Sequence, residues 1–316
     1  LLKTQASKLK LAATNLELGV EKLVSAKIVK EGGITVPINT FHSLVNNSDS
    51  ERINLETKDN NLIFKTDNYE AKIQGIKEDE FPIMPKIDDQ QHFLEIKANV
   101  FKELLNKVAG AAQVSEIRPE ISGVLFDFQI TLLKLAATDS FRLAEAIIHE
   151  KHFKANFNQG FKIIVPLKTI QEVLRVFGDD QLLRIHFDAS QILIKSDDLE
   201  LISRLIDGEY PDYESIIPKD FEASINIDRE NFINAVKLVS NFSGKVNDIK
   251  LRFAKDAKNL ELYSANQQLG ENNYLVPAKI TGPALEAVSF NWRYLLDGLK
   301  ARTSESVYFG LNADSR

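Results

Sequence analysis

Apolar residues recur at intervals of three and four in several short stretches of the chain. This spacing places side chains along one side of a helix, so each stretch predicts a helix of about three turns with one buried face. The stripes are Phe101, Leu104, Leu105 and Val108; Ile170, Val173, Leu174 and Phe177; Phe232, Ala235, Val236 and Val239; Trp292, Leu295, Leu296 and Leu299; and, one turn shorter, Phe41, Leu44 and Val45.

Between these stretches, apolar residues alternate with polar ones or form short runs. Both patterns are typical of β-strands. They predict strands at 52–56, 61–65, 123–128, 183–187, 191–194, 250–253 and 307–311. The chain therefore alternates one helix with about three or four strands, and this favours an α+β fold of antiparallel sheets.

The sequence also repeats itself at long intervals. Leu9–Asn15 returns as Leu133–Asp139, 124 positions later (133 minus 9), and more weakly as Leu260–Asn266, a further 127 positions on (260 minus 133). Ile34–Pro37 and Glu80–Pro82 also return, both 129 positions later, at 163–166 and 209–211. Matches in one order at consistent offsets indicate three copies of one domain. We expect domains at 1–90, 91–218 and 219–316.

The offsets carry two further expectations. Their shift from 124 to 129 predicts five extra residues in the second copy, in a loop at 152–160. Three domains of two helices require six helices, whereas the stripes give five. We expect the sixth helix to precede residue 1, and roughly two strands to follow residue 316, so that the first and third domains are incomplete.

Composition excludes several classes of protein. With 316 residues, 44% hydrophobic and 27% charged, the chain has the balance of a globular protein with more than one domain. No apolar run approaches the eighteen or so residues of a membrane helix. The absence of cysteine excludes disulfides and thiolate metal sites and is consistent with a cytoplasmic protein. The net charge of −6 argues mildly against nucleic acid as a partner, but it does not locate the charges.

Candidate catalytic and metal-ligating groups are sparse. There is no glycine-rich phosphate loop and no nucleophile or metalloprotease motif, so we expect no enzyme activity. The acidic run Glu78–Glu80 has no His or Lys partner at motif spacing. His149 and His152 lie close together in a polar connector, where surface exposure is favoured over a metal site. We expect no cofactor and no metal.

Specific residues in the second copy resemble a known family. Ala137–Ala144 reads A-T-D-S-F-R-L-A and follows Ser122–Phe126, which reads S-G-V-L-F. Ile164–Pro166 precedes a predicted helix, and Asp207–Tyr213 reads D-G-E-Y-P-D-Y. Together these segments resemble the bacterial sliding clamp, the beta subunit of DNA polymerase III. The internal repeat extends the resemblance over nearly the whole chain.

The resemblance implies a fold and a function. It implies three clamp domains, each with two helices on antiparallel sheets, and a head-to-tail homodimer that closes into a ring around duplex DNA. Such a ring acts as a processivity factor. The implied partners are DNA of any sequence, the replicative polymerase, the clamp loader and other proteins with a clamp-binding motif. The resemblance implies no membrane partner and no cofactor.

Three groups of site residues follow. Lys168, Arg175 and Lys237 lie opposite the apolar stripes of their helices, and the resemblance adds Arg118, so that these four residues are expected to contact DNA phosphates. The resemblance implies a partner-peptide pocket at Ile121, Thr138, Arg142, Leu143, Pro211, Tyr213 and Ile216. It implies a dimer interface at Leu44, Ala71, Ile73, Leu238 and Val239. Two residues depart from the family. Phe141 lies where the family often has a small polar residue or His, and Ser215 lies where a basic residue is common.

Simpler interpretations remain open for these residues. Any solvated helix face carries mixed charges, and here Glu103, Glu172 and Asp297 lie near the same faces. Leu143, Ile216, Leu238 and Val239 would also fit as core residues. The alternative function is a repeat-built scaffold that binds proteins without encircling DNA, and the electrostatic potential of the helix face distinguishes the two.

Overall fold

The computed structural model describes residues 1–87, 92–253, 258–283 and 287–312. The chain forms two compact units, one of residues 1–102, 126–133 and 148–207 and one of residues 103–125, 134–147 and 208–316. The middle repeat is divided between the two units, so the expected limits of three domains stay a prediction. In the described part of the chain, no helix has the length and apolar character needed to cross a membrane.

The five predicted helices are all present. They are α1 (Ile38–Asn46), α2 (Ala98–Ala109), α3 (Leu167–Val176), α4 (Arg229–Val239) and α5 (Trp292–Lys300). The α4 helix begins where Asp228 accepts a hydrogen bond from the backbone N–H of Asn231, which satisfies a donor that the helix cannot. The stripes of α2, α3 and α4 are largely buried, as predicted. In α1 the prediction was less accurate, because Val45 is exposed and only Phe41 and Leu44 pack inward.

A nine-stranded sheet dominates the first unit. Its order is β12-β8-β14-β15-β16-β3-β2-β1-β4. The strands are β1 (Leu2–Gln5), β2 (Lys8–Thr14), β3 (Leu18–Ser25), β4 (Gly33–Ile34), β8 (Leu94–Lys97), β12 (Phe153–Ala155), β14 (Leu182–Phe187), β15 (Gln191–Lys195) and β16 (Leu199–Arg204). The first and second repeats meet where β16 pairs antiparallel with β3, with Leu201 opposite Val20. Two repeats therefore share one continuous sheet.

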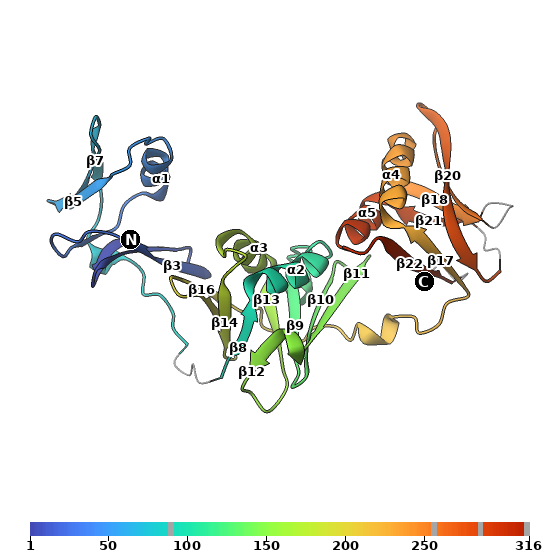
Figure 1. Ribbon diagram of the computed structural model, residues 1–316, viewed down its shortest axis with the longest axis horizontal. Coiled ribbons are helices and arrows are strands. Elements are labelled where there is room, and N and C mark those ends of the chain that lie inside the picture. Colours follow the sequence, from blue (N-terminus) through green and yellow to red (C-terminus); the bar gives the residue numbers. More distant parts are fainter. Residues whose placement is uncertain (88–91, 254–257, 284–286, 313–316) are drawn as a thin grey trace. The chain divides into compact units, whose positions relative to one another are not determined.

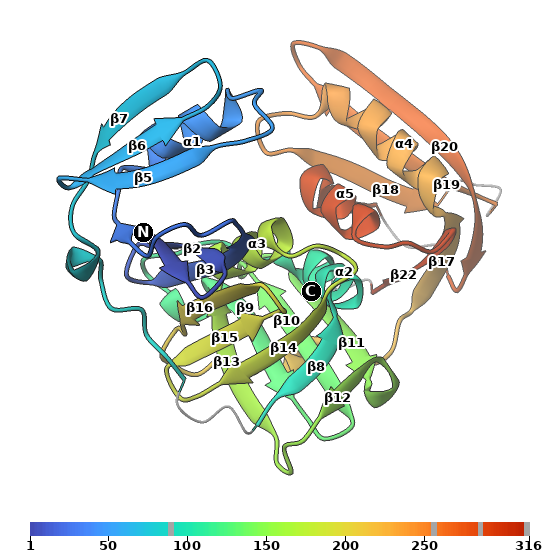
Figure 2. The same cartoon turned by 60° about the vertical axis from the view of Figure 1, so that its left-hand side comes forward.

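A smaller sheet completes the first repeat. It has the order β5-β6-β7, from β5 (Asn54–Lys58), β6 (Asn61–Lys65) and β7 (Glu70–Gln74). Figure 2 shows α1 lying against this sheet. Phe41 and Leu44 of α1 pack there on a core that contains Leu62 and Ile73. The apolar stripe of α1 thus covers the inner face of β5–β7.

Two further sheets hold the remaining strands. The order β11-β10-β9-β13 is formed by β9 (Gly123–Phe128), β10 (Leu132–Thr138), β11 (Leu143–His149) and β13 (Phe161–Pro166). The order β21-β18-β19-β20-β17-β22 is formed by β17 (Ala223–Asp228), β18 (Asp248–Phe253), β19 (Asn259–Asn266), β20 (Gly270–Thr281), β21 (Val288–Asn291) and β22 (Ser306–Leu311). Figure 1 shows α4 and α5 side by side against the second of these sheets. Their apolar residues, among them Phe232, Val236 and Leu296, form one core with its strands.

Short 3-10 helices occupy several connections. They are η1 (Glu78–Glu80), η2 (Pro119–Ile121), η3 (Glu150–His152), η4 (Glu214–Ile216) and η5 (Ser240–Phe242). The extra residues expected as a loop at 152–160 include a strand instead, because β12 lies there and pairs with β8 at the sheet edge. His149 and His152 are both exposed, as expected for a polar connector.

The turn after the repeated segment has the same hydrogen bonds in all three copies. The side chains of Asn15, Asp139 and Asn266 each accept backbone N–H bonds from the residues two and three positions further on, at 2.8–3.3 Å. Such bonds close a turn without help from other side chains. The last donor in each turn is Leu18, Arg142 or Leu269. The middle copy is thus the one with a charged side chain at this position.

Candidate functional site

The loop between β10 and β11, residues 139–142, is fixed by its own polar groups. The Thr138 hydroxyl donates a hydrogen bond to the Arg142 carbonyl oxygen at 2.7 Å and accepts one from the Ser140 backbone N–H at 3.1 Å. Ser140 has a φ of +74°, a conformation that costs a non-glycine residue energy and that this turn maintains. Only 2% of the Asp139 side chain is exposed. A buried carboxylate needs such partners to offset its desolvation.

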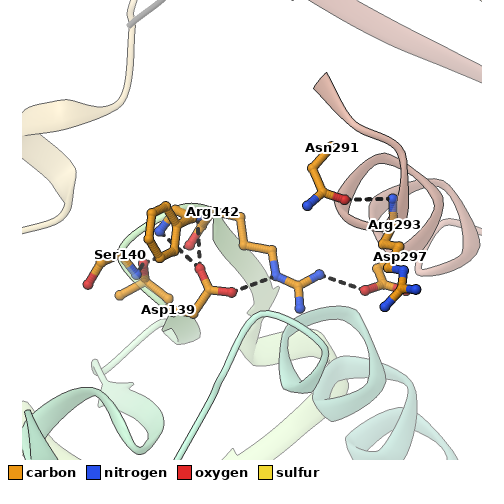
Figure 3. A network of polar contacts seen from close by, with 8 residues as sticks. Asp139, Ser140, Arg142, Asn291, Arg293 and Asp297 are labelled. Carbon is orange, nitrogen blue, oxygen red and sulfur yellow. Dashed lines mark hydrogen bonds and ion pairs between the residues drawn. The ribbon is translucent and has the colours of Figure 1, made fainter. Parts of the chain in front are cut away.

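Arg142 extends from this loop to helix α5. Its Nε donates to Asp139 Oδ2 at 3.1 Å, and its Nη1 donates to Asp297 Oδ2 at 2.6 Å. The guanidinium carbon also lies 4.3 Å from the ring centre of Tyr294. Figure 3 shows the side chain extended between the two carboxylates. Burial alone would lower the pKa of Arg142, but the hydrogen bonds that it donates to Asp297 and Asp139 outweigh this effect, and the pKa is raised.

Leu143, the next residue, belongs to an apolar cluster. It packs with Tyr210 against buried Leu125, Ala136 and Tyr213, and we call these five residues the apolar cluster. The two tyrosine rings meet edge to face, with centres 6.3 Å apart. Burial raises the pKa of Tyr210 to about 12.

The polar end of Tyr213 is held by charged neighbours. Its hydroxyl donates to Glu145 Oε2 at 2.7 Å. Lys134 Nζ lies 3.7 Å from the same carboxylate and 2.7 Å from Glu214 Oε1. The segment that follows β16 is therefore anchored to β11 by the Tyr213 hydroxyl and to β10 by the Lys134–Glu214 ion pair.

The structure brings together part of the pocket predicted from the sequence. Thr138, the last residue of β10, is hydrogen-bonded to Arg142 of the β10–β11 loop, and Leu143 contacts the cluster around Tyr213. Ile121 is buried, and Pro211 is half-buried. Ile216 is 71% exposed and Leu143 is half-buried, so neither is a fully buried core residue. Phe141, two residues before Leu143, is 81% exposed.

The four cations predicted to contact DNA are all exposed. Lys168 and Arg175 lie on α3, where Arg175 Nε donates to Glu172 at 2.9 Å. Lys237 lies on the last turn of α4. Arg118 precedes η2 and donates to Glu120 Oε1 at 3.1 Å and to the Ser140 hydroxyl at 3.0 Å. Arg118 is thus hydrogen-bonded to the same loop that carries Arg142.

The five predicted interface residues differ in exposure. Leu238 is 53% exposed, and Leu44 and Ala71 are half-buried. Ile73 and Val239 are 5% and 1% exposed, because Ile73 of β7 and Val239 of α4 each belong to a hydrophobic core. Their side chains support the surface from beneath and do not form it.

Several residues of this site were missed from the sequence. Tyr294 and Asp297 lie three positions apart on α5 and therefore share one face, but nothing nearby in the sequence links them to Arg142. The available signal was the comparison of copies, in which Arg142 replaces a leucine. Among residues 1–87, 92–253, 258–283 and 287–312, no three His, Asp or Glu side chains are grouped so that they could hold a metal ion.

Comparison with known proteins places the whole chain in one family. Models of the N-terminal, central and C-terminal domains of the DNA polymerase III beta subunit match residues 1–85, 95–212 and 214–316. The chain is 29% identical to the beta sliding clamp of Synechococcus elongatus over 98% of its own length and 82% of the relative. It is 29% identical to that of Bacillus subtilis over 90% of its own length and 74% of the relative.

Solved structures give the same result. A DNA polymerase sliding clamp from Bacillus subtilis superposes with a TM-score of 0.89 at 25% identity, over 98% of this chain and 83% of the other. A DNA polymerase III beta chain from Streptococcus pneumoniae superposes with a TM-score of 0.89 at 26% identity, over 99% and 84%. The matches of all three domains, one after another along the chain, identify it as a member of the DNA polymerase III beta subunit family, the beta sliding clamps.

Proposed function

We propose that the protein is a DNA sliding clamp that encircles duplex DNA as a head-to-tail homodimer and tethers the replicative polymerase, the clamp loader and other partners. The observation that carries this proposal is the match of all three repeats to clamp domains. A clamp of this kind acts by topology and binding, so we propose that it has no catalytic centre and works in the cytoplasm, where bacterial DNA is replicated.

The junction between the first two repeats supplies a template for the dimer interface. There β16 pairs with β3. In the first repeat β7 takes the place of β16, because β7 pairs with β6 as β16 pairs with β15. In the third repeat β20 takes the place of β3, because β20 pairs with β19 as β3 pairs with β2. Within the described residues, β7 and the first half of β20 each have one side without a partner strand.

The template also gives a register. In the first repeat, buried Leu62 of β6 lies opposite Ile73 of β7. In the second repeat, the equivalent Ile192 lies opposite Ser203 of β16, so Ser203 corresponds to Ile73. One residue earlier on each strand, Ile202 therefore corresponds to Lys72. In the third repeat, Leu262 of β19 lies opposite Tyr274 of β20, and in the first repeat the equivalent Leu11 lies opposite Lys22 of β3. Lys22 therefore corresponds to Tyr274. Three residues earlier on each strand, Gly19 corresponds to Glu271. Because Ile202 lies opposite Gly19, we expect Lys72 of one protomer to lie opposite Glu271 of its partner.

This arrangement would satisfy the exposed strand edges. Unpaired edges are a liability in a free chain, and a second copy would cover both of them. The cross-strand pair would join opposite charges, which favours antiparallel pairing. Leu44, Ala71 and Leu238 would then form the surface of the interface, with Ile73 and Val239 beneath.

We propose that the exposed cations of the helices bind the DNA backbone. Arg118, Lys168, Arg175 and Lys237 would contact phosphates only, because a ring that slides must not read base sequence. Arg118 and Arg175 already have carboxylate partners, so their contacts would exchange one anion for another.

We propose that partner peptides bind at the apolar cluster and the β10–β11 loop. A peptide with Gln followed by Leu and Phe would bury its apolar side chains beside Leu143, Pro211 and Ile216, while Thr138 and Arg142 orient its polar groups. Burying a Leu or Phe side chain stabilises a complex by roughly 1.5–3 kcal/mol. Two such anchors would give about micromolar affinity after the cost of ordering the peptide.

The experiment that tests encirclement compares DNA topologies. The protein is loaded on nicked circular DNA and its retention is measured by gel filtration, before and after a restriction enzyme linearises the DNA. A clamp stays on the circle and slides off the linear molecule. If the protein were lost equally from circular and linear DNA, it would not encircle DNA. The alternative function, a scaffold that binds proteins, would then be favoured.

A further inference from the structure

Arg142 closes its own turn with backbone groups alone, and its side chain has no part in those bonds. The turns at Asn15 and Asn266 form the same side-chain-to-backbone hydrogen bonds with leucine at the corresponding position. In the middle copy the Asp139 carboxylate makes these bonds and still has Oδ2 available for Arg142. The arginine is therefore a feature added to a turn that folds without it.

The added side chain reaches a helix of the third repeat. Its guanidinium donates to Asp297 and stacks on Tyr294, and both of these residues belong to α5. Figure 3 shows Arg142 as the bridge between Asp139 of the loop and Asp297 of the helix. The loop and α5 are thus linked through one side chain whose position is fixed at both ends.

Each end of this link adjoins a different candidate binding surface. Leu143 follows Arg142 directly and packs in the apolar cluster. On the other side, Arg293 of α5 is exposed, one turn before Asp297, and its guanidinium lies 5.2 Å from the ring centre of Trp292. A peptide at Leu143 and a phosphate at Arg293 would therefore both contact elements that Arg142 joins.

We propose that Arg142 is a positioning residue that couples peptide binding at the apolar cluster to DNA binding at α5. A peptide packed on Leu143 restricts the loop, and through the Arg142–Asp297 pair it restricts α5. Arg293 then loses less freedom when it binds a phosphate, so peptide raises DNA affinity and DNA raises peptide affinity by the same factor. This inference rests on the proposed function, because it needs both ligands.

The expected size follows from exposure. The side chain of Asp297 is 48% exposed, so solvent weakens the ion pair. Coupling between sites typically changes affinity about 5- to 150-fold, and a half-exposed link belongs at the lower end. We expect peptide to raise DNA affinity about fivefold.

The test measures the affinity for a short DNA duplex at fixed salt, with and without a saturating synthetic peptide that carries Gln, Leu and Phe anchors. Arg142→Leu installs the residue of the other two copies, and Asp297→Asn breaks the link from the helix side. Arg252→Leu is the matched control, because Arg252 also pairs with a carboxylate, Glu261, and stacks on a tyrosine, Tyr263. Peptide affinity is measured for each variant, so that saturation is ensured.

A second measurement needs no ligand. Hydrogen exchange of the α5 amides should be faster in Arg142→Leu and Asp297→Asn than in the parent and in Arg252→Leu. The amides of the β10–β11 turn should exchange at the parent rate in Asp297→Asn, because the bonds of that turn do not involve α5.

The outcomes separate the two proposals. Fivefold coupling in the parent and Arg252→Leu, with none in Arg142→Leu and Asp297→Asn, supports the link. Coupling that persists in both link variants, or a parent that binds each ligand but shows no coupling, overturns the inference and leaves the clamp function intact. A parent that binds no peptide contradicts the proposed peptide site, and the inference falls with it.

Discussion

At the residue scale, Asp139 combines two roles. One carboxylate closes a turn through two backbone N–H groups and holds Arg142 through its second oxygen. Both functions depend on burial, because the hydrogen bonds of a solvated carboxylate compete with water.

Asp139→Ala should therefore lower the free energy of unfolding by about 1–3 kcal/mol, since it leaves two part-buried backbone N–H groups and the Arg142 guanidinium without this acceptor. Urea denaturation at neutral pH measures the change. Asp139→Asn is the matched control, because Asn15 and Asn266 hold the same turn in the other copies. We expect the Asn variant to lose about 1 kcal/mol or less. Equal losses in both variants would contradict this account of the turn.

Leu143 offers a test of the peptide site, because its side chain is only half-buried. Leu143→Asp places a charge against the apolar anchors of a peptide and should weaken binding at least about 100-fold, the equivalent of about 2.7 kcal/mol. Isothermal calorimetry measures the affinity. Val246→Asp, at an exposed residue of the turn before β18, is the control and should bind as the parent does. Unchanged binding by Leu143→Asp would place the site elsewhere.

At the scale of the element, strand pairing between repeats organises the molecule. The pairing of β16 with β3 makes one sheet from two repeats, and the same pattern in β7 and β20 leads to the proposed dimer. Backbone pairing sets the register, and side chains at the edge then favour or oppose it.

A charge exchange tests that register. Lys72→Glu would place two acidic residues opposite each other at both junctions of the ring, and should weaken the dimer about 5- to 30-fold, from roughly 0.5–1 kcal/mol at each junction. Adding Glu271→Lys in the same chain should restore the affinity. Sedimentation over a concentration series measures the dimer constant.

Lys250→Glu serves as the control for total charge, because Lys250 lies on β18 with a partner strand on each side. If Glu271→Lys failed to rescue Lys72→Glu, the register would be wrong. If neither change affected the dimer, these two strands would not meet.

The elements also show what the sequence could and could not predict. Helices were predicted well, because a stripe such as Phe101, Leu104 and Val108 is local and each helix buries it. The same reasoning failed for Val45, where a short helix covers only a three-stranded sheet and leaves one edge of its stripe in solvent. Local pattern indicates that a face is apolar, but the size of the covering sheet decides how much of it is buried.

Contacts between repeats lay beyond the sequence. The motif at Ala137–Ala144 singled out the segment that forms the β10–β11 loop, but the link from this loop to Asp297 joins residues 155 positions apart. The pairing of β16 with β3 likewise depends on how two repeats meet, which no periodicity encodes. The resemblance to a family supplied the site residues Thr138, Leu143 and Tyr213, and it could not show that Ile73 and Val239 point inward.

At the scale of the whole molecule, charge must be judged by location. The chain has a net charge of −6, yet Lys168, Arg175 and Lys237 are exposed on helices. A ring that holds DNA loosely needs a few phosphate contacts and no strong attraction over its outer surface.

Salt dependence tests that arrangement. Replacing Arg118 and Lys168 with Ala should weaken DNA binding equally on unrelated sequences and make the slope of log affinity against log salt shallower by about 0.9 for each phosphate that is no longer neutralised. Fluorescence anisotropy at several salt concentrations measures the slope. Arg184→Ala with Lys154→Ala removes the same charge from strands β14 and β12 and should leave the slope at the parent value. A double variant of Arg118 and Lys168 that bound as the parent does would contradict the assignment.

The recurring turn has a consequence for how such a molecule can change over generations. Asn15, Asp139 and Asn266 close this turn with bonds to the backbone. The side chain three positions further on takes no part in these bonds, so it can be replaced in one copy while the other two copies stay as they are. A duplicated scaffold thus carries three interchangeable positions at which a new contact can be tried at little risk to the fold. For protein engineering, Leu18 and Leu269 are the positions at which a second or third arginine link could be installed.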